Sequence, residues 1–274
     1  MFKHFIAKAS LVVLGLVLTV SAFGAEELVI NGSTTVLPIA QKAAEVFMKA
    51  NPDVSISVSG TGSGDGIKAL IDGTTDIADA SRFIKDIEIT KAIDNGVFPV
   101  AHRIALDSIA PIVHPGNPVS NLTMKQLKGI YMGEITNWKE VGGEDKEIVV
   151  VSRDTSSGTY EVWHEKVLEK ERVTPKASLL ASNGAVAMAV AKNSYAIGYV
   201  GLGYVNKEVK MLSVNGITPT AETTISGEYP IARALFMFTD GWPKGVALNF
   251  INFLVSPAGQ KLVEEVKYVP FYSM

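Results

Sequence analysis

The chain has 274 residues, 47% of them hydrophobic and 19% charged, which is enough to bury the core of one large or two ordinary globular domains. It contains no cysteine, which excludes disulfides, thiolate catalysis, cysteine-ligated zinc and a lipid-modified N-terminal cysteine. The formal net charge of -3 repels anions and nucleic acid slightly, so any affinity for an anion has to come from local groups.

The first 24 residues have the organisation of a secretory signal sequence. Lys3, His4 and Lys8 precede an apolar run over residues 11–20, and Ala22-Phe23-Gly24 places small residues where a signal peptidase reads the chain. The alternative is a membrane anchor, but the run is shorter than the ~20 residues that span a bilayer. We therefore predict a cleaved signal peptide over residues 1–24 and a mature protein free in the periplasm.

The part of the chain up to residue 94 alternates short apolar runs with segments of helical periodicity. Strands are predicted over residues 28–30, 54–58 and 76–78, and helices over residues 39–47, 67–71 and 86–94. Asn51-Pro52 and Asp72-Gly73 end the first two helices. This alternation is the pattern of an α/β sheet.

A long, mainly apolar strand over residues 104–113 leads into a second set of elements. These are helices near residues 124–131, after Ser157-Gly158 and over residues 185–191, and strands over residues 148–151 and 196–200. A second apolar run over residues 231–238 crosses back and is followed by helices near residues 246–254 and 258–266. Two crossings predict two α/β lobes with a hinged cleft, lobe 1 formed by residues 25–108 plus 230–274 and lobe 2 by residues 109–229.

Three turns that join a predicted strand to a predicted helix are rich in small hydroxyl residues. They are Gly32-Ser33-Thr34-Thr35, the glycine-rich loop over residues 59–66, and Arg153-Asp154-Thr155-Ser156-Ser157-Gly158-Thr159. A helix N-terminus attracts anions through its free N–H groups and its dipole, and the guanidinium of Arg153 suits two oxygens at once. Such turns lie at the carboxyl ends of strands, where open α/β sheets bind ligands. The alternative for any single Ser or Thr is a helix cap.

Other chemistries find little support in the sequence. The segment Gly60-Thr61-Gly62 lacks the third glycine of a dinucleotide motif, and no Gly-Lys-Ser/Thr triplet exists for a P-loop. No Gly-x-Ser-x-Gly elbow is present, and His164 is more simply a helix-face histidine than a catalytic base. The histidines are scattered, which gives no metal motif. Trp138, Trp163 and Trp242 are too dispersed for a sugar or nucleic-acid platform, so we expect each in a core.

Several motifs together resemble those of the periplasmic phosphate-binding proteins of ABC transporters. The motifs are Asn31-Gly32-Ser33-Thr34-Thr35-Val36-Leu37-Pro38, Gly62-Ser63-Gly64-Asp65-Gly66-Ile67, Asp76-Ile77-Ala78-Asp79-Ala80-Ser81-Arg82, Ser157-Gly158-Thr159 and Ala196-Ile197-Gly198-Tyr199. The resemblance implies the type II periplasmic binding protein fold, in which two mixed-sheet α/β lobes enclose a ligand. It also implies a protein without enzymatic activity or cofactor that carries inorganic phosphate to permease subunits in the inner membrane, and a monomer is the simplest form of such a carrier.

The resemblance also suggests ligand-binding positions. Hydroxyl and amide donors are expected at Ser33, Thr34, Ser63, Ser157, Gly158 and Thr159, and the ligand-binding arginine at Arg153. The best-known family pattern has an aspartate that accepts the proton of hydrogen phosphate, where this chain has Ser81 followed by Arg82. Asp107 is then the candidate acceptor and Asp79 the second choice. Arg82 either touches the anion or pairs with a carboxylate such as Asp107.

An acceptor carboxylate matters because it favours a protonated anion over fully ionised sulfate. Without such a carboxylate, the chain could instead be a sulfate or molybdate carrier. A phosphate sensor is a further alternative to a phosphate carrier. A serine-dependent exported phosphatase is a more distant alternative, because no base or metal motif supports it.

Overall fold

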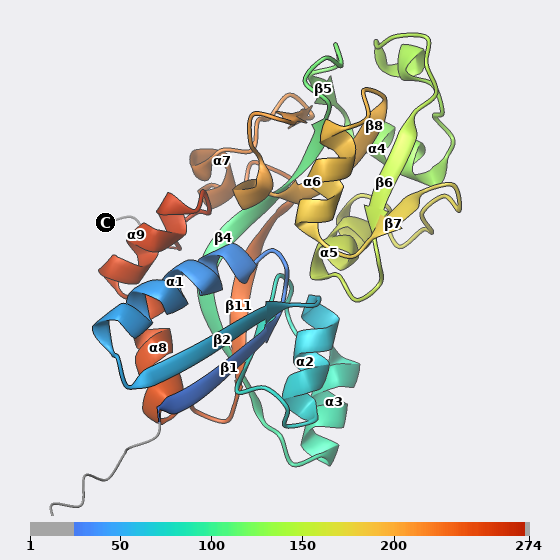
Figure 1. The fold of residues 1–274 in the computed structure, drawn as a ribbon. Coiled ribbons are helices and arrows are strands. Elements are labelled where there is room, and N and C mark those ends of the chain that lie inside the picture. The colour runs from blue at the N-terminus through green and yellow to red at the C-terminus, as the bar shows by residue number, and fades with distance from the viewer. Residues whose placement is uncertain (1–24, 272–274) are drawn as a thin grey trace, which may run out of the picture.

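The computed structural model describes residues 25–271, so the predicted signal peptide lies outside the described residues. Within this range, no helix combines the length and apolar character needed to cross a membrane. Figure 1 shows an elongated molecule in which two groups of helices and strands are joined by two long strands.

The main sheet has nine strands and mixes parallel with antiparallel pairs. Its order is β2-β1-β3-β11-β4-β8-β6-β7, with β9 paired to β4. The strands are β1 (Glu26–Gly32), β2 (Val54–Gly60), β3 (Ile77–Ala80), β4 (Pro99–Val113), β6 (Val149–Arg153), β7 (Ser178–Leu180), β8 (Ala196–Gly201), β9 (Lys210–Met211) and β11 (Ala232–Asp240). A separate pair is formed by β5 (Asn121–Leu122) and β10 (Ser213–Val214).

The described helices include those that the sequence predicts and add one over Ala221–Ile225 that it did not predict. They are α1 (Leu37–Ala50), α2 (Ser63–Ile71), α3 (Asp86–Asp94), α4 (Met124–Met132), α5 (Gly158–Lys166), α6 (Asn183–Ala191), α7 (Ala221–Ile225), α8 (Gly245–Val255) and α9 (Pro257–Glu265). Short 3-10 helices cover Trp138–Val141 and Leu202–Tyr204. Pro38 at the start of α1 suits the first helical turn, where the missing N–H has no intrahelical acceptor.

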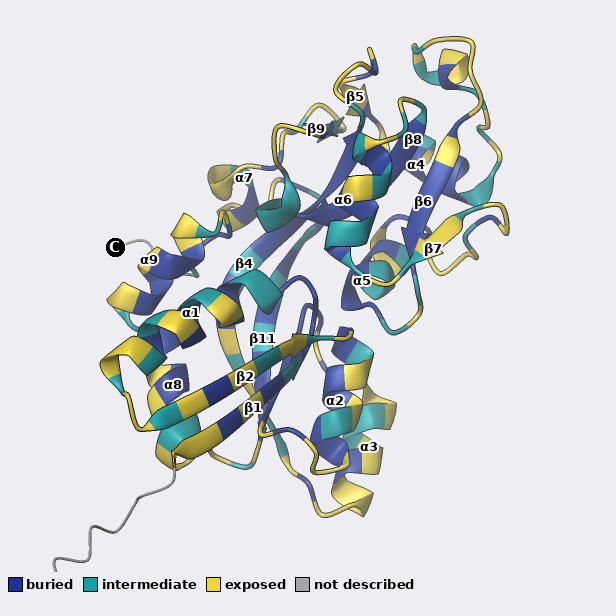
Figure 2. Ribbon diagram, in the orientation of Figure 1, coloured by how far each residue is buried: buried dark blue, intermediate teal, exposed yellow. Residues whose placement is uncertain are grey.

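Strands β4 and β11 run antiparallel and connect the two halves (Figure 1). We call the half with β1–β3, α1–α3, α8 and α9 lobe 1, and the half with β5–β10 and α4–α7 lobe 2. Each lobe has its own buried core: Leu28, Ile39 and Phe250 belong to that of lobe 1, and Leu127 and Trp163 to that of lobe 2. Strand β4 is buried mainly from residue 104 onward, and buried residues alternate with intermediate ones along the first half of β11 (Figure 2). The exact lobe boundaries given above remain predictions.

The tryptophans divide between core and surface. Trp138 and Trp163 are buried, as predicted, and the Trp163 ring stacks on Tyr199 with centroids 4.2 Å apart. The prediction for Trp242 is wrong, because this side chain is 70% exposed. It lies in the turn after β11 and touches only the edge of the His102 ring among aromatic partners within residues 25–271.

Candidate functional site

The first hydroxyl turn is held by main-chain contacts at the end of β1. The Ser33 N–H donates to the Asp79 carbonyl at 2.9 Å, which ties the turn to β3. Gly32 has φ +146°, and a Cβ there would lie 2.2 Å from the Asp79 carbonyl oxygen, so only glycine fits. Ser33 Oγ accepts from the N–H groups of Thr35 at 3.1 Å and Val36 at 3.4 Å. The Ser33 side chain therefore caps the turn, which leaves the hydroxyls of Thr34 and Thr35 for other partners.

The glycine-rich loop and the exit of β3 meet beneath the opposite lobe. Ser63, the first residue of α2, accepts from the Ser81 N–H at 3.0 Å, and both residues are buried. The Gly64 N–H donates to the Ser156 carbonyl of lobe 2 at 2.9 Å. A Cβ on Gly158 would lie 2.4 Å from Ser63 Oγ and 2.8 Å from Ser81 Oγ, so the lobes meet closely at this glycine.

The third turn starts α5. Ser157 is its N-cap and accepts from the Tyr160 N–H at 3.2 Å. Gly158 and Thr159 occupy the first turn, whose N–H groups have no intrahelical acceptors. Thr159 Oγ1 lies 2.9 Å from Thr35 Oγ1 of lobe 1, so hydroxyls from the first and third turns touch across the cleft. The structure thus brings the three predicted turns together.

Arg153 is a buried cation that forms no ion pair with a carboxylate among the described residues. Its Nε donates to the Leu180 carbonyl at 2.9 Å and its Nη2 to the Ala181 carbonyl at 2.8 Å. Nη1 has no hydrogen-bond partner within residues 25–271, although the residue is 1% exposed. Burial lowers the pKa of Arg153, because removal from water disfavours the charged form. A guanidinium held only by carbonyls, with one nitrogen free, can accept an anion.

Arg82 lies at the rim of the cleft and pairs with two carboxylates, but not with Asp107. Its Nη2 lies 2.6 Å from Glu88 Oε1, and its Nε lies 2.8 Å from Glu161 Oε2 of lobe 2. Lys85 also reaches Glu161, at 2.7 Å. Of the two hypotheses for Arg82, the geometry favours ion pairing, with glutamates in place of the suggested Asp107.

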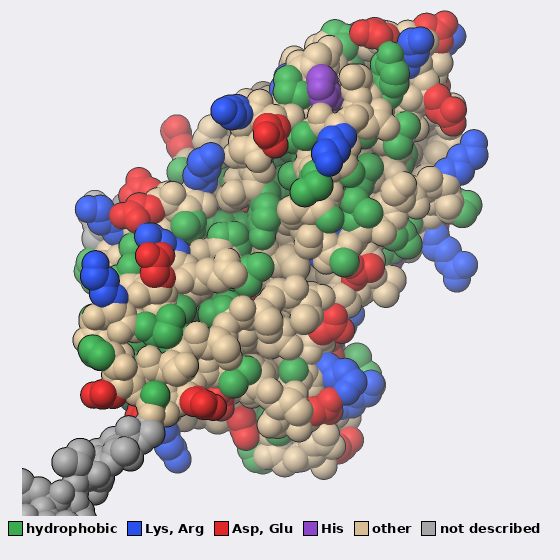
Figure 3. Space-filling model, viewed as in Figure 1, with side chains coloured by type: hydrophobic (Ala, Val, Ile, Leu, Met, Phe, Trp, Pro, Cys, Tyr) green, Lys and Arg blue, Asp and Glu red, His purple; other side chains and the backbone are tan. Residues whose placement is uncertain are grey.

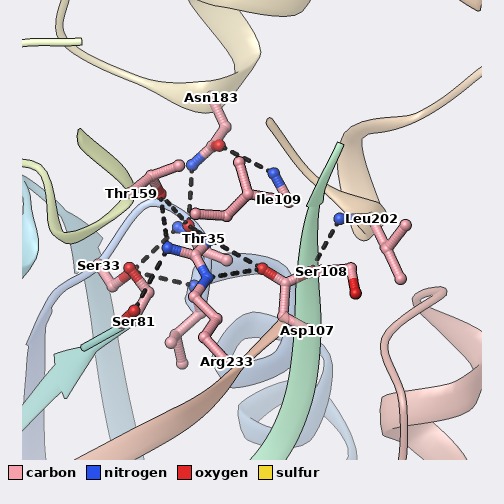
Figure 4. A network of polar contacts seen from close by, with 12 residues as sticks. Ser33, Thr35, Ser81, Asp107, Ser108, Ile109, Thr159, Asn183, Leu202 and Arg233 are labelled. Atoms are coloured by element: carbon pink, nitrogen blue, oxygen red, sulfur yellow. Dashed lines mark hydrogen bonds and ion pairs between the residues drawn. The ribbon is translucent and has the colours of Figure 1, made fainter. Parts of the chain in front are cut away.

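Asp107 instead pairs with Arg233, which lies opposite it in the antiparallel pairing of β4 and β11. Asp107 Oδ2 accepts from Arg233 Nε at 2.9 Å and Nη2 at 2.7 Å, and Oδ1 accepts from the Leu202 N–H at 2.9 Å. Figure 4 shows the Arg233 guanidinium between Asp107 and the hydroxyls of Thr35 and Thr159. Burial raises the pKa of Asp107, and the charge of Arg233 opposes that rise. With three hydrogen bonds accepted, this carboxylate is already well satisfied.

Asp79 is the opposite case. It is fully buried on β3, and neither carboxylate oxygen has a hydrogen-bond partner among the described residues. Burial without a partner raises the pKa of Asp79 well above its usual range, which favours the protonated carboxyl.

The sequence reasoning missed Asn183, Tyr204 and Arg233. Asn183 Nδ2 donates to Thr34 Oγ1 at 2.9 Å, and the Tyr204 O–H donates to the Thr34 carbonyl at 2.5 Å. Arg233 could have been noticed as the single charged residue in the apolar run over residues 231–238. Asn183 follows a Ser at a predicted helix start, which gave a weaker signal.

On the face of the molecule drawn in Figure 3, the charges are mixed rather than concentrated. Figure 3 shows acidic and basic side chains interspersed on the visible face. Because the net charge is -3, we expect the positive charge for an anion to come from the buried arginines.

Comparison with known proteins gives consistent matches over most of the chain. The profile of the PBP superfamily domain matches residues 19–258. The phosphate-binding protein PstS of Bacillus subtilis is 34% identical over 249 residues, which cover 90% of this chain and 81% of the relative. PstS of Borreliella burgdorferi is 35% identical over 248 residues, covering 86% of this chain and 87% of the relative.

Solved structures match the fold as well. A putative phosphate ABC transporter substrate-binding protein from Clostridium perfringens, with bound phosphate, has a TM-score of 0.84 at 36% identity and covers 89% of this chain and 99% of that one. An ABC-type phosphate transport receptor from Vibrio cholerae has a TM-score of 0.73 at 33% identity, with 88% and 99% covered.

Proposed function

The chain belongs to the PstS family of phosphate-binding proteins, and from this we propose that it binds inorganic phosphate between its lobes for delivery to an ABC transporter. It is a binding protein that performs no chemistry on its ligand. Arg153 is the main support for an anion site in the cleft. It is fully buried, its Nη1 is free, and it has no carboxylate partner within residues 25–271. Such a charge gains most from an anion placed against it.

We propose that phosphate is held by groups from all three turns. The proposed ligand groups are Thr34, Ser63, Ser81, Arg153, Ser157, Gly158 and Thr159. Their burial and their convergence on the contact between the lobes support this set. Ser33 then shapes the turn as a cap, Asp107 holds Arg233, and Arg82 ties the rim of the cleft.

Binding would be coupled to closure of the lobes, which we divide at residues 25–108 plus 230–274 and 109–229. Contacts that cross the cleft, such as Thr35 to Thr159 and Gly64 to Ser156, exist only when the lobes meet. A ligand that bridges the lobes shifts the equilibrium toward this closed form. We propose that the closed monomer, in the periplasm after removal of residues 1–24, docks on permease subunits in the inner membrane.

Calorimetric titration of residues 25–274, freed of ligand, tests this function. Phosphate is added alone and in excess sulfate, near neutral pH and again at alkaline pH. We expect tight one-to-one binding that sulfate does not affect. Equal competition by sulfate or molybdate would assign the cleft to a general oxyanion carrier, and no heat from any of these anions would refute anion binding.

A further inference from the structure

The hydroxyls of Thr34, Thr35 and Thr159 contact two side chains that donate hydrogen bonds to them. One is the carboxamide of Asn183 at the start of α6 in lobe 2, and the other is the guanidinium of Arg233 on β11. All five residues are buried, with Arg233 the most exposed at 9%. Hydroxyls from both lobes therefore meet donors in a buried site (Figure 4).

The backbone fixes the orientation of the Asn183 carboxamide. Its Oδ1 accepts from the Gly201 N–H at 3.2 Å, so Nδ2 faces the threonines. Nδ2 donates to Thr34 Oγ1 at 2.9 Å and to Thr35 Oγ1 at 3.0 Å. The Asn183 backbone N–H also points to Thr34 Oγ1, at 3.4 Å. Asn183 thus supplies three donor contacts to two hydroxyls.

Counting lone pairs fixes where the hydroxyl hydrogens go. A hydroxyl has one hydrogen to donate and two lone pairs to accept. Thr35 Oγ1 accepts from Asn183 and from Arg233 Nη2 at 3.2 Å, so its own hydrogen is donated along the 2.9 Å contact to Thr159 Oγ1. Thr159 Oγ1 also accepts from Arg233 Nη1 at 3.1 Å, which fills its second lone pair.

Two hydrogens remain, those of the Thr34 and Thr159 hydroxyls. The lone pairs of Thr34 Oγ1 are taken by Asn183, and those of Thr159 Oγ1 by Thr35 and Arg233. No acceptor for either hydrogen occurs among the hydrogen bonds of residues 25–271. In the closed arrangement of the lobes, both hydroxyls are therefore left to donate to a ligand oxygen.

We propose that Asn183 and Arg233 are positioning residues that commit Thr34 and Thr159 to donate to a bound oxyanion. This inference rests on the proposed function of the cleft. The two hydroxyls favour an oxygen without a proton, because a P–OH group in donor orientation would face another donor. Asn183 and Arg233 act on the ligand through the threonines and, in this assignment, have no contact with it.

A double-mutant cycle on the mature protein, read as phosphate affinity by calorimetry, tests the role of Asn183. Asn183→Ala lets the hydroxyls rotate, and we expect it to weaken phosphate binding about 10-fold. In a background carrying Thr34→Val and Thr159→Val, the same change is expected to cost less than about 2-fold, because the hydroxyls it orients are gone. Equal losses in both backgrounds would overturn the proposal.

Controls separate orientation from folding and from the function itself. Thermal unfolding without phosphate establishes that each variant is folded, and Asn206→Ala, on the surface, should leave affinity unchanged. If Asn183→Ala does not fold, Asn183→Ser takes its place in the cycle, since it lacks the second donor hydrogen. A wild-type protein that does not bind phosphate would refute the proposed function, whereas binding with additive losses would refute the positioning role alone.

Discussion

Two buried arginines near the cleft have opposite surroundings. Arg233 forms two hydrogen bonds with the Asp107 carboxylate, whereas the only hydrogen-bond acceptors of the Arg153 guanidinium within residues 25–271 are the carbonyls of Leu180 and Ala181. The charge of Arg233 also contributes to the lowered pKa of Arg153, after the larger effect of burial. The charge of Arg233 is neutralised within the fold and stabilises it, whereas the charge of Arg153 stays unbalanced until an anion neutralises it.

The largest effect is expected where the internal pair is broken. Asp107→Asn leaves Arg233 buried without a counter-charge, and we expect a loss of about 3–5 kcal/mol in the free energy of unfolding. Urea unfolding without phosphate measures this loss. Asp72→Asn, which breaks the exposed ion pair with Lys68, should change stability by less than about 1 kcal/mol. Similar values for both variants would remove the distinction between a buried and a surface pair.

Replacing Arg153 should leave the stability of the fold intact and weaken the binding of phosphate. Arg153→Met deletes a buried cation without orphaning a carboxylate, so we expect unchanged or higher stability in the absence of phosphate. Phosphate affinity should fall by about 2–5 kcal/mol, which is about 30-fold or more. Calorimetry and urea unfolding provide the two readings, with the exposed Arg172→Met as the matched control. Undiminished phosphate binding would exclude Arg153 from the site.

Local signals in the sequence predicted much of the fold and the three turns. The α/β fold class is confirmed by the solved relatives, and the turns follow from hydroxyl residues placed where helices start. The first five residues of β4, Pro99 to Arg103, were missed, because they lack an apolar run and owe their strand to pairing with β11. The partners of Asn183 and Arg233 also lie far away in sequence: Asn183 binds Thr34 across 149 positions and Arg233 binds Thr35 across 198. No local pattern encodes such contacts.

Asp79 differs from the buried arginines, because a buried carboxyl can lose its charge by binding a proton, whereas an arginine stays charged. Its folded pKa is raised well above the ordinary value of 3.8, so the native state holds the proton over a range in which the unfolded state has lost it. Stability should therefore fall as pH rises above 3.8, by about 1.4 kcal/mol for each pH unit, until the folded pKa is passed. Asp79→Asn removes this slope.

Urea unfolding at several pH values compares the wild type with Asp79→Asn. The difference between the two profiles isolates Asp79 from other titrating groups, and the exposed Asp94→Asn should follow the wild type. Parallel profiles for wild type and Asp79→Asn would mean that this carboxyl finds a partner in solution.

The smallest effect is expected at the rim, where a third arginine, Arg82, pairs with two glutamates, one of them in lobe 2. Arg82 and Glu161 bridge the lobes with side-chain exposures of 6% and 18%, so salt and water screen this pair more than the Asp107 pair. Glu161→Gln weakens a contact that exists only in the closed form, and we expect phosphate affinity to fall about 2- to 5-fold at low salt.

Glu165→Gln, exposed on the same helix, is the matched control. The loss should shrink as salt is added, because an ion pair at the rim is screened, whereas the loss caused by Arg153→Met should persist at all salt concentrations. A Glu161→Gln protein that binds phosphate like the wild type at low salt would show that the rim pair does not stabilise closure.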